Sequence, residues 1–385
     1  MDPNYAKFRG VRFFGSLDGL RALSIIGVIW FHSWWGTRYY PRLAAMPVLR
    51  QGSYGVHVFF VVSGFLITTL LLREMQRYGT ISLRDFYIRR ALRIWPLYYL
   101  VLAFYVLNAL VFERGTVRAH SFLHYLPSFA TFTYTWFISA NWPGGMFNLA
   151  WTLATEEQSY LFWPFALRIL RGIRSSVLIV GIIGLKIATD YNLTARFLPR
   201  EWLPTRIVLS VSVAICMGVL LAQALHSPRG FKLLYRVFGY KWSAPLMLAA
   251  MLACLAPGHP PMLLAFTATT ALVAASVVRE DNGLASVLRW RPVAFIGTLS
   301  YGMYLLNSVS IHFVHFVVTR LGSEYPPLIF VLATGVAVAS AYVSYRYYES
   351  PFLALKAKYS RLRPVPAQEA SAGIRVPETS APLHP

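Results

Sequence analysis

The chain of 385 residues contains a series of apolar runs, and each is close to the length that a helix needs to cross about 30 Å of hydrocarbon. With 56% hydrophobic and only 13% charged residues, the composition excludes an ordinary soluble domain. We therefore expect an all-α polytopic membrane protein with about ten transmembrane helices in one bundle. These runs lie near residues 20–36, 54–72, 95–112, 151–168, 176–190, 205–225, 242–257, 261–278, 293–318 and 327–348.

The strongly positive charge is the second feature that narrows the class of protein. A net charge of +21 suggests nucleic-acid binding when it is considered alone. Lysine and arginine, however, gather in short loops between the apolar runs, as in the cytoplasmic loops of membrane proteins. We therefore expect contact with membrane lipids and none with nucleic acid. The same pattern predicts that both termini lie in the cytoplasm.

One aromatic segment, residues 122–138, leaves the number of crossings ambiguous. If it crossed the membrane, the basic loop 168–174 would lie outside, against the usual distribution of positive charge. We expect this segment to be interfacial or re-entrant.

The domain organisation is simple. Residues 1–352 are expected to form one membrane domain, and residues 353–385, rich in Pro, Ala, Ser and charged residues, a disordered cytoplasmic tail. Cys216 and Cys254 lie in apolar runs without paired or metal-type spacing, and the intramembrane histidines lack a partner at metal-binding spacing. We expect neither a disulfide nor a metal site.

Two polar residues interrupt the first apolar run. Arg21 and His32 are eleven residues apart, which brings a helix back to within roughly 20° of the same face, about 16 Å further along. An ionisable residue inside a membrane helix is costly unless it faces protein or water, so it is a candidate functional residue. We expect both side chains on one stripe, with His32 the first candidate for catalysis.

An Arg-x-x-Arg pair stands at the start of the third run. Arg90 and Arg93 are three residues apart and therefore neighbours on one helix face, near the cytoplasmic side. Guanidinium groups bind phosphate oxygens in a bidentate manner, so the pair can hold the phosphates of an acyl-CoA or nucleotide donor. Ordinary juxtamembrane charge is the alternative.

Small residues among aromatic ones mark the second run. Ser63 and Gly64 allow close approach of a thin ligand or of another helix. A substrate channel and helix packing explain the pair equally well.

Two adjacent carboxylates, Glu156 and Glu157, follow the start of an otherwise apolar helix. The helix N-terminus accounts for one of them, and the other is left as an orienting or acid/base group near the outer side, where His32 also points. The flanking Trp151 and Tyr160 can stack on a sugar acceptor or belong to the interfacial aromatic belt.

Together these segments resemble the acyltransferase-3 family of integral-membrane acyltransferases over about residues 12–352. The family pattern departs at two positions: Asn307 stands where many members carry a histidine, and Ser159 replaces an aromatic residue. The resemblance is carried by Leu17-Asp18-Gly19-Leu20-Arg21-Ala22 with Phe31-His32, by Phe59 to Leu66, by Arg90-Ala91-Leu92-Arg93 with Pro96 and Tyr98, by Trp151-Thr152-Leu153 with Glu156, and by the late segments Ile296 to Leu305 and Tyr345 to Pro351.

The resemblance implies an enzyme that transfers an acyl group, most often acetyl, from cytoplasmic acyl-CoA to a carbohydrate or glycoside hydroxyl. Acyl-CoA would be a co-substrate, and no bound cofactor is implied. The expected location is the bacterial inner (plasma) membrane. His32 would act as general base or transient acyl carrier, and Glu156 would orient the imidazole or the acceptor. Arg21, with Asp18 as its ion-pair partner, would position the donor or stabilise the developing oxyanion. Ser63 and Gly64, with Arg90 and Arg93, would belong to the donor site.

A function from another class fits the same pattern of charge. A transporter or flippase for a lipid-linked sugar would also place Arg21 and His32 along a path through a helical bundle. A purely structural subunit leaves the aligned Arg21 and His32 without an explanation. Consumption of acyl-CoA by the purified protein distinguishes the enzyme from the transporter.

Overall fold

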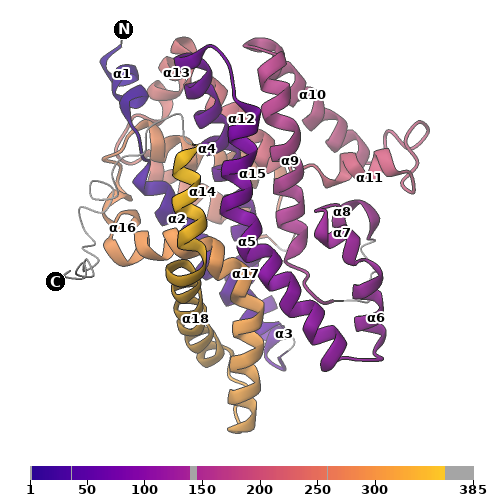
Figure 1. The fold of residues 1–385 in the computed structure, drawn as a ribbon. Helices are drawn as coiled ribbons and strands as arrows, with labels where there is room; N and C mark the ends of the chain where they lie inside the picture. Colours follow the sequence, from indigo (N-terminus) through magenta and orange to yellow (C-terminus); the bar gives the residue numbers. More distant parts are fainter. Residues whose placement is uncertain (1, 36, 139–144, 258, 360–385) are drawn as a thin grey trace, which may run out of the picture.

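The computed structural model describes residues 2–35, 37–138, 145–257 and 259–359, and over these residues the chain is helical and contains no strand (Figure 1). The elements are α1 (Pro3–Gly10), α2 (Gly15–Trp34), α3 (Tyr40–Ala44), η1 (Leu49–Tyr54), α4 (Gly55–Tyr78), α5 (Leu83–Val111), α6 (Val117–His124), α7 (Leu126–Ala130), α8 (Tyr134–Phe137), α9 (Ala150–Ile169), α10 (Ile173–Asp190), α11 (Leu203–Ser210), α12 (Val213–Leu225), α13 (Pro228–Phe238), α14 (Ser243–Leu255), α15 (Met262–Val278), α16 (Ala285–Leu288), α17 (Arg291–Arg320), α18 (Pro326–Val343), η2 (Ser344–Glu349) and α19 (Ser350–Lys358).

The all-α class expected from the apolar runs is confirmed, and each run is helical, although residues 205–225 form two helices, α11 and α12, with a bend of 57° between them. Among the described residues, 4 helices are long and apolar enough to cross a membrane alone, or up to 7 if each bent pair of helices is one span. The expectation of about ten crossings is therefore not confirmed. The other long apolar helices are less suited by composition or length: α9 carries Glu156 and Glu157, α10 carries Arg174, Lys186 and Asp190, and α15 has 17 residues.

The aromatic segment 122–138 covers the end of the short helix α6 and the whole of the short helices α7 and α8. None of them is long enough to span the hydrocarbon. The Gln158 side chain on α9 anchors the segment, because its Nε2 donates to Phe132 O at 2.7 Å and its Oε1 accepts from Trp136 Nε1 at 3.1 Å. A polar side chain of α9 therefore forms hydrogen bonds with the irregular segment beside it.

Close backbone contact between α4 and α12 forms the centre of the bundle. A Cβ atom on Gly64 would overlap the carbonyl oxygen of Ile215, and one on Gly218 would overlap that of Val61. Small residues at such a crossing allow two helix backbones to approach, as is typical of membrane helices. Gly64 therefore packs against α12.

The last long helix changes its hydrogen-bond pattern at η2, a π-helical segment. Pro351, two residues after the end of this segment, has no backbone N–H, so it cannot bond to the carbonyl four residues earlier, and its ring crowds that carbonyl. The widened turn is continued by α19, which runs through the expected domain boundary at residue 352 to Lys358. Residues 360–385 of the expected tail lie outside the described part.

The N-terminal helix α1 lies at the same end of the bundle as α13 (Figure 1). The Tyr5 hydroxyl donates to His226 O at 2.7 Å, and the rings of Phe8 and Phe231 lie 5.4 Å apart. These contacts fix the approach of the chain to α2, where the first candidate site residues begin.

Candidate active site

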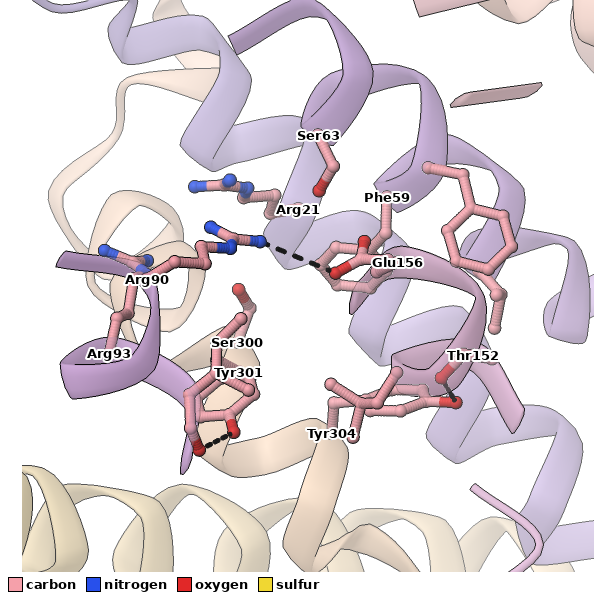
Figure 2. Close-up of a pocket in the computed structure, with 14 residues that line it drawn as sticks. Arg21, Phe59, Ser63, Arg90, Arg93, Thr152, Glu156, Ser300, Tyr301 and Tyr304 are labelled. Atoms are coloured by element: carbon pink, nitrogen blue, oxygen red, sulfur yellow. Dashed lines mark hydrogen bonds and ion pairs between the residues drawn. The ribbon is translucent and has the colours of Figure 1, made fainter. Parts of the chain in front are cut away.

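Five helices, α2, α4, α5, α9 and α17, surround a small buried cavity of about 80 Å³ inside the bundle (Figure 2). We call it the central cavity. Charged and hydroxyl groups project into it among aromatic rings, which is unusual for the interior of a membrane protein and typical of a functional site. Its walls are Arg21, Val56, Phe59, Phe60, Ser63, Arg90, Arg93, Ile94, Thr152, Leu153, Glu156, Ser300, Tyr301 and Tyr304.

Arg90 is held by three groups from α9. Its Nη2 lies 3.8 Å from Glu156 Oε2, and its Nε lies 3.8 Å from Glu157 Oε1. Its guanidinium carbon is 3.9 Å from the centre of the Tyr160 ring. The desolvated arginine is thus stabilised by two carboxylates and by the face of an aromatic ring.

The two adjacent carboxylates have different surroundings. Glu157 also accepts a hydrogen bond of 3.4 Å from Trp95 Nε1, whereas Glu156 lines the central cavity. Glu156 is therefore the carboxylate that can meet a ligand. It lies beside Arg90, six residues inside α9 and about 9 Å along its axis.

Arg21 is paired within its own helix. Its Nη1 lies 3.4 Å from Asp18 Oδ1, at i,i+3 spacing on α2. Helix α17 comes very close at this point, since a Cβ atom on Gly297 would overlap Asp18 O. Because residue 297 is a glycine, α17 can pack directly against the part of α2 that carries Asp18 and Arg21.

A second cavity of about 560 Å³ adjoins the first, and we call it the vestibule. Arg21, Arg93 and Tyr301 line both cavities, so the two are neighbours that share one wall. The vestibule is lined by Phe13, Asp18, Arg21, Arg93, Gly297, Thr298, Leu299, Tyr301, Gly302, Ala341, Tyr345, Glu349, Leu353 and Lys356.

The expected donor residues divide into two groups. Arg90, Arg93 and Ser63 line the central cavity, so the structure brings the arginine pair and the serine together. Gly64 instead faces the backbone of α12. Of the two explanations left open for the Ser63-Gly64 pair, the cavity applies to Ser63 and helix packing to Gly64.

His32 lies in the last turn of α2, eleven residues beyond Arg21. It is not among the described residues that line either cavity. The Asn307 side chain and, more remotely, His312 are its polar neighbours from α17. Among the described residues, neither His32 Nδ1 nor Asn307 Oδ1 has a hydrogen-bond partner. Asn307 Nδ2 donates to Tyr304 O at 2.6 Å, so Asn307 links His32 to the wall of the central cavity.

The two aromatic residues expected at an acceptor site are not neighbours. Trp151 is 40% exposed at the start of α9 and packs edge-on against Phe60. Tyr160 is buried beneath Arg90, on the same side as the arginine pair. About three turns of α9 separate Tyr160 from the helix start, where Trp151 lies.

Several wall residues were not singled out from the sequence. Tyr301 donates to Ile94 O at 2.6 Å, and the hydroxyl groups of Thr152 and Tyr304 are joined by a 2.8 Å hydrogen bond. Both tyrosines belong to the segment 296–305, which carries part of the family resemblance. That resemblance was the sequence signal that could have pointed to them. Lys356 stands in an unremarkable sequence context, and only the fold brings it into the vestibule.

A family model described as an acyltransferase domain matches residues 14–346 of the chain. The peptidoglycan O-acetyltransferase OatA of Listeria monocytogenes is 30% identical over 75% of this chain and 48% of that protein. A Bacillus subtilis protein named "Putative peptidoglycan O-acetyltransferase YrhL" is 29% identical over 90% of this chain and 56% of its own length. The chain thus spans about half the length of these relatives. No solved structure matches it.

Proposed function

The chain belongs to the acyltransferase-3 family, and we propose that it is an integral-membrane O-acyltransferase that uses cytoplasmic acyl-CoA, acetyl-CoA above all, as donor. The acceptor would be a hydroxyl group of a surface or lipid-linked carbohydrate or other glycoside. The names of the two relatives, which specify O-acetyl transfer to peptidoglycan, support this class of acceptor.

The observation that carries the proposal is the convergence of Arg21, Arg90 and Glu156 on one cavity inside an apolar bundle. Such groups are expensive in hydrocarbon and need a ligand or a reaction to account for them. Arginine side chains bind phosphate and stabilise a developing oxyanion, and a carboxylate beside them can orient a hydroxyl group. This set of groups suits acyl transfer from a thioester donor that carries phosphate groups, such as acyl-CoA.

In the proposed reaction, neutral His32 accepts the proton of the acceptor hydroxyl as its oxygen attacks the thioester carbonyl carbon. The new C–O bond forms and the C–S bond breaks, and the departing CoA thiolate takes up the proton from the imidazolium. Arg21 faces the developing negative charge on the carbonyl oxygen. In the variant mechanism, His32 first carries the acyl group itself.

The direction of transfer follows from the expected topology. With both termini in the cytoplasm, the basic ends of α4 and α5 face the donor, and the last turn of α2 lies towards the opposite side. A donor bound near Arg93 would therefore point its thioester along α2 towards His32. The acceptor would approach from the far side of the membrane.

The decisive experiment is acyl transfer by the purified chain in nanodiscs, with radiolabelled acetyl-CoA and peptidoglycan fragments or oligosaccharides as acceptors. We expect product with the native chain and none with His32→Ala, while a variant of another histidine, His315→Ala on α17, remains active. Normal transfer by the His32 variant would contradict the assignment. Mass spectrometry of surface glycans from a deletion strain then identifies the acceptor by its missing acetyl groups.

The purified chain reconstituted in vesicles tests the transporter alternative. A flippase would move a fluorescent lipid-linked sugar across vesicles without consuming acyl-CoA, and substitution of His32 would slow that movement. Release of CoA thiol that depends on an added hydroxyl acceptor supports the enzyme and contradicts the flippase.

A further inference from the structure

Two cationic side chains that line the vestibule, Arg93 and Lys356, have no ion-pair partner within 4.0 Å among the described residues, although the charges of Asp18 and Glu349 act on Arg93 from further away. Among the described residues, Arg93 and Lys356 form no hydrogen bond or ion pair, although both line the cavity. Lys356 has Arg93, Arg90 and Arg89 as its charged neighbours. Cations that are gathered without partners in a sheltered space form an anion site.

The two carboxylates of the same cavity are already engaged. Asp18 is paired with Arg21, and Glu349 Oε1 accepts a hydrogen bond of 2.9 Å from Ser344 Oγ. Neither carboxylate is within 4.0 Å of a nitrogen of Arg93 or Lys356 in an ion pair. The positive groups therefore stay available to a ligand.

The C-terminal helical segment supplies a continuous wall of the vestibule. Tyr345, Glu349, Leu353 and Lys356 follow one another at spacings of four, four and three residues, so they share one helix face. The Tyr348 hydroxyl donates to Pro96 O at 3.2 Å and holds this wall against α5, the helix of Arg93.

A second anchor lies at the end of α19. Arg89 Nη1 donates to Tyr359 O at 2.7 Å, and Arg89 Nη2 pairs with the buried Glu74 at 3.1 Å. These bonds hold the end of α19, which carries Lys356, against α5, the helix of Arg93. The segment lies beyond residue 346, where the match to the family model ends.

We propose that Lys356, together with Arg93, binds the phosphate groups of the donor nucleotide in the vestibule, so that the C-terminal helix α19 completes the donor site. This inference rests on the proposed function, since it assigns a part of the donor to a part of the fold. The nucleotide would remain in the vestibule, and the acyl-pantetheine arm would pass Tyr301 into the central cavity.

The size and chemistry of the two cavities support this division. The vestibule is several times larger than the central cavity, about 560 against 80 Å³, as a bulky nucleotide and a thin arm require. A lysine and an arginine together can neutralise a diphosphate or a phosphate monoester. An anionic lipid headgroup carries the same phosphate chemistry, so the test must separate the two sources.

The test compares the full-length chain with Lys356→Gln and with Lys358→Gln, an exposed lysine two residues further along the same helix. Binding of CoA is measured by calorimetry in nanodiscs of phosphatidylcholine. We expect the Lys356 variant to bind CoA about tenfold more weakly, as for loss of one charged hydrogen bond, and the Lys358 variant to bind normally. Lys356→Arg should restore most of the affinity.

A donor without phosphates provides the second arm. Acetylpantetheine should be used equally well, by kcat/KM, by the native chain and by Lys356→Gln. An equal loss with acetyl-CoA and acetylpantetheine would overturn the phosphate assignment, as would unchanged CoA affinity in the Lys356 variant. An effect of Lys356 that appears only after phosphatidylglycerol is added would assign the site to a lipid headgroup and overturn the proposal.

The proposed function fails in a different way. If the native chain binds no CoA at all, the donor itself is wrong. If the native chain binds CoA and Lys356→Gln binds it equally well, only the role of the C-terminal helix is wrong.

Discussion

The Nη2 atom of Arg90 lies 3.8 Å from the Oε2 atom of Glu156, and this ion pair joins α5 to α9 across the central cavity (Figure 2). Both side chains are largely buried, with exposed fractions of 17% and 14%. An arginine of the expected donor site and a carboxylate of the expected catalytic set therefore belong to one site. This proximity makes the charge balance around Arg90 the first property to test.

The first prediction concerns the two carboxylates that pair with Arg90. Glu156→Gln and Glu157→Gln each remove one negative charge at the same ion-pair distance, so both should destabilise the protein by roughly 1–3 kcal/mol. Only Glu156 lines the cavity, so Glu156→Gln should lower kcat/KM at least tenfold and Glu157→Gln much less. Thermal unfolding and acetyl transfer measure the two effects. Equal loss of activity in both variants would contradict a special role for Glu156.

The second prediction concerns Asn307, which connects His32 to the central cavity. Asn307→Ala should lower kcat about tenfold and leave KM for the donor unchanged, because the amide orients the imidazole and does not touch the donor. Ser310→Ala, which alters another buried polar residue of α17, should retain full activity. A rise in the donor KM of the Asn307 variant would argue against a positioning role.

The third prediction concerns the crossing of α4 and α12. Gly64→Ala would force the two backbones apart, which should cost about 1–3 kcal/mol and lower the melting temperature in detergent. Gly184→Ala on α10 is the matched control, because a Cβ atom there meets nothing within 4 Å. It should leave stability unchanged or raise it slightly, since alanine is the better helix former. A tolerated alanine at position 64 would show that the crossing is loose.

The fourth prediction concerns pH. Burial, with Arg73 and Arg9 nearby, lowers the pKa of the His226 imidazole from 6.5 to about 4, against the opposing hydrogen bond with Ala222 O. Between these values the unfolded chain binds the proton and the folded chain does not, so stability should fall as pH drops from 6.5 towards 4. His226→Asn should flatten the dependence of the melting temperature on pH over that range. The exposed His120→Asn should leave it as in the native chain.

Much of the fold was predictable from local sequence patterns. Apolar runs predicted the long helices, because burial of side chains in lipid is a local requirement that each segment meets by itself. The spacing of Arg21 and Asp18 predicted their neighbouring positions on one helix, since i,i+3 contacts need no tertiary information. The pair Arg90 and Arg93 was likewise recognisable as a candidate site, because residues three apart lie on one face of a helix.

The number of crossings was less predictable than the helices themselves. Charged residues inside α9 and α10 reduce their hydropathy, and whether such a segment spans the membrane depends on what faces those charges. The segment from α6 to α8 is held by Gln158, a residue on another helix, so its path was not encoded locally.

The sequence by itself determined the class of the protein, the helices and the residue types from which a site could be built. Tertiary packing decided which of these residues meet: it placed Glu156 beside Arg90, Gly64 against α12, and Lys356 of α19 in the same cavity as Arg93. The physical reason is that a helix sets only the face on which a side chain lies. Its depth and its neighbours follow from how helices distant in the chain cross.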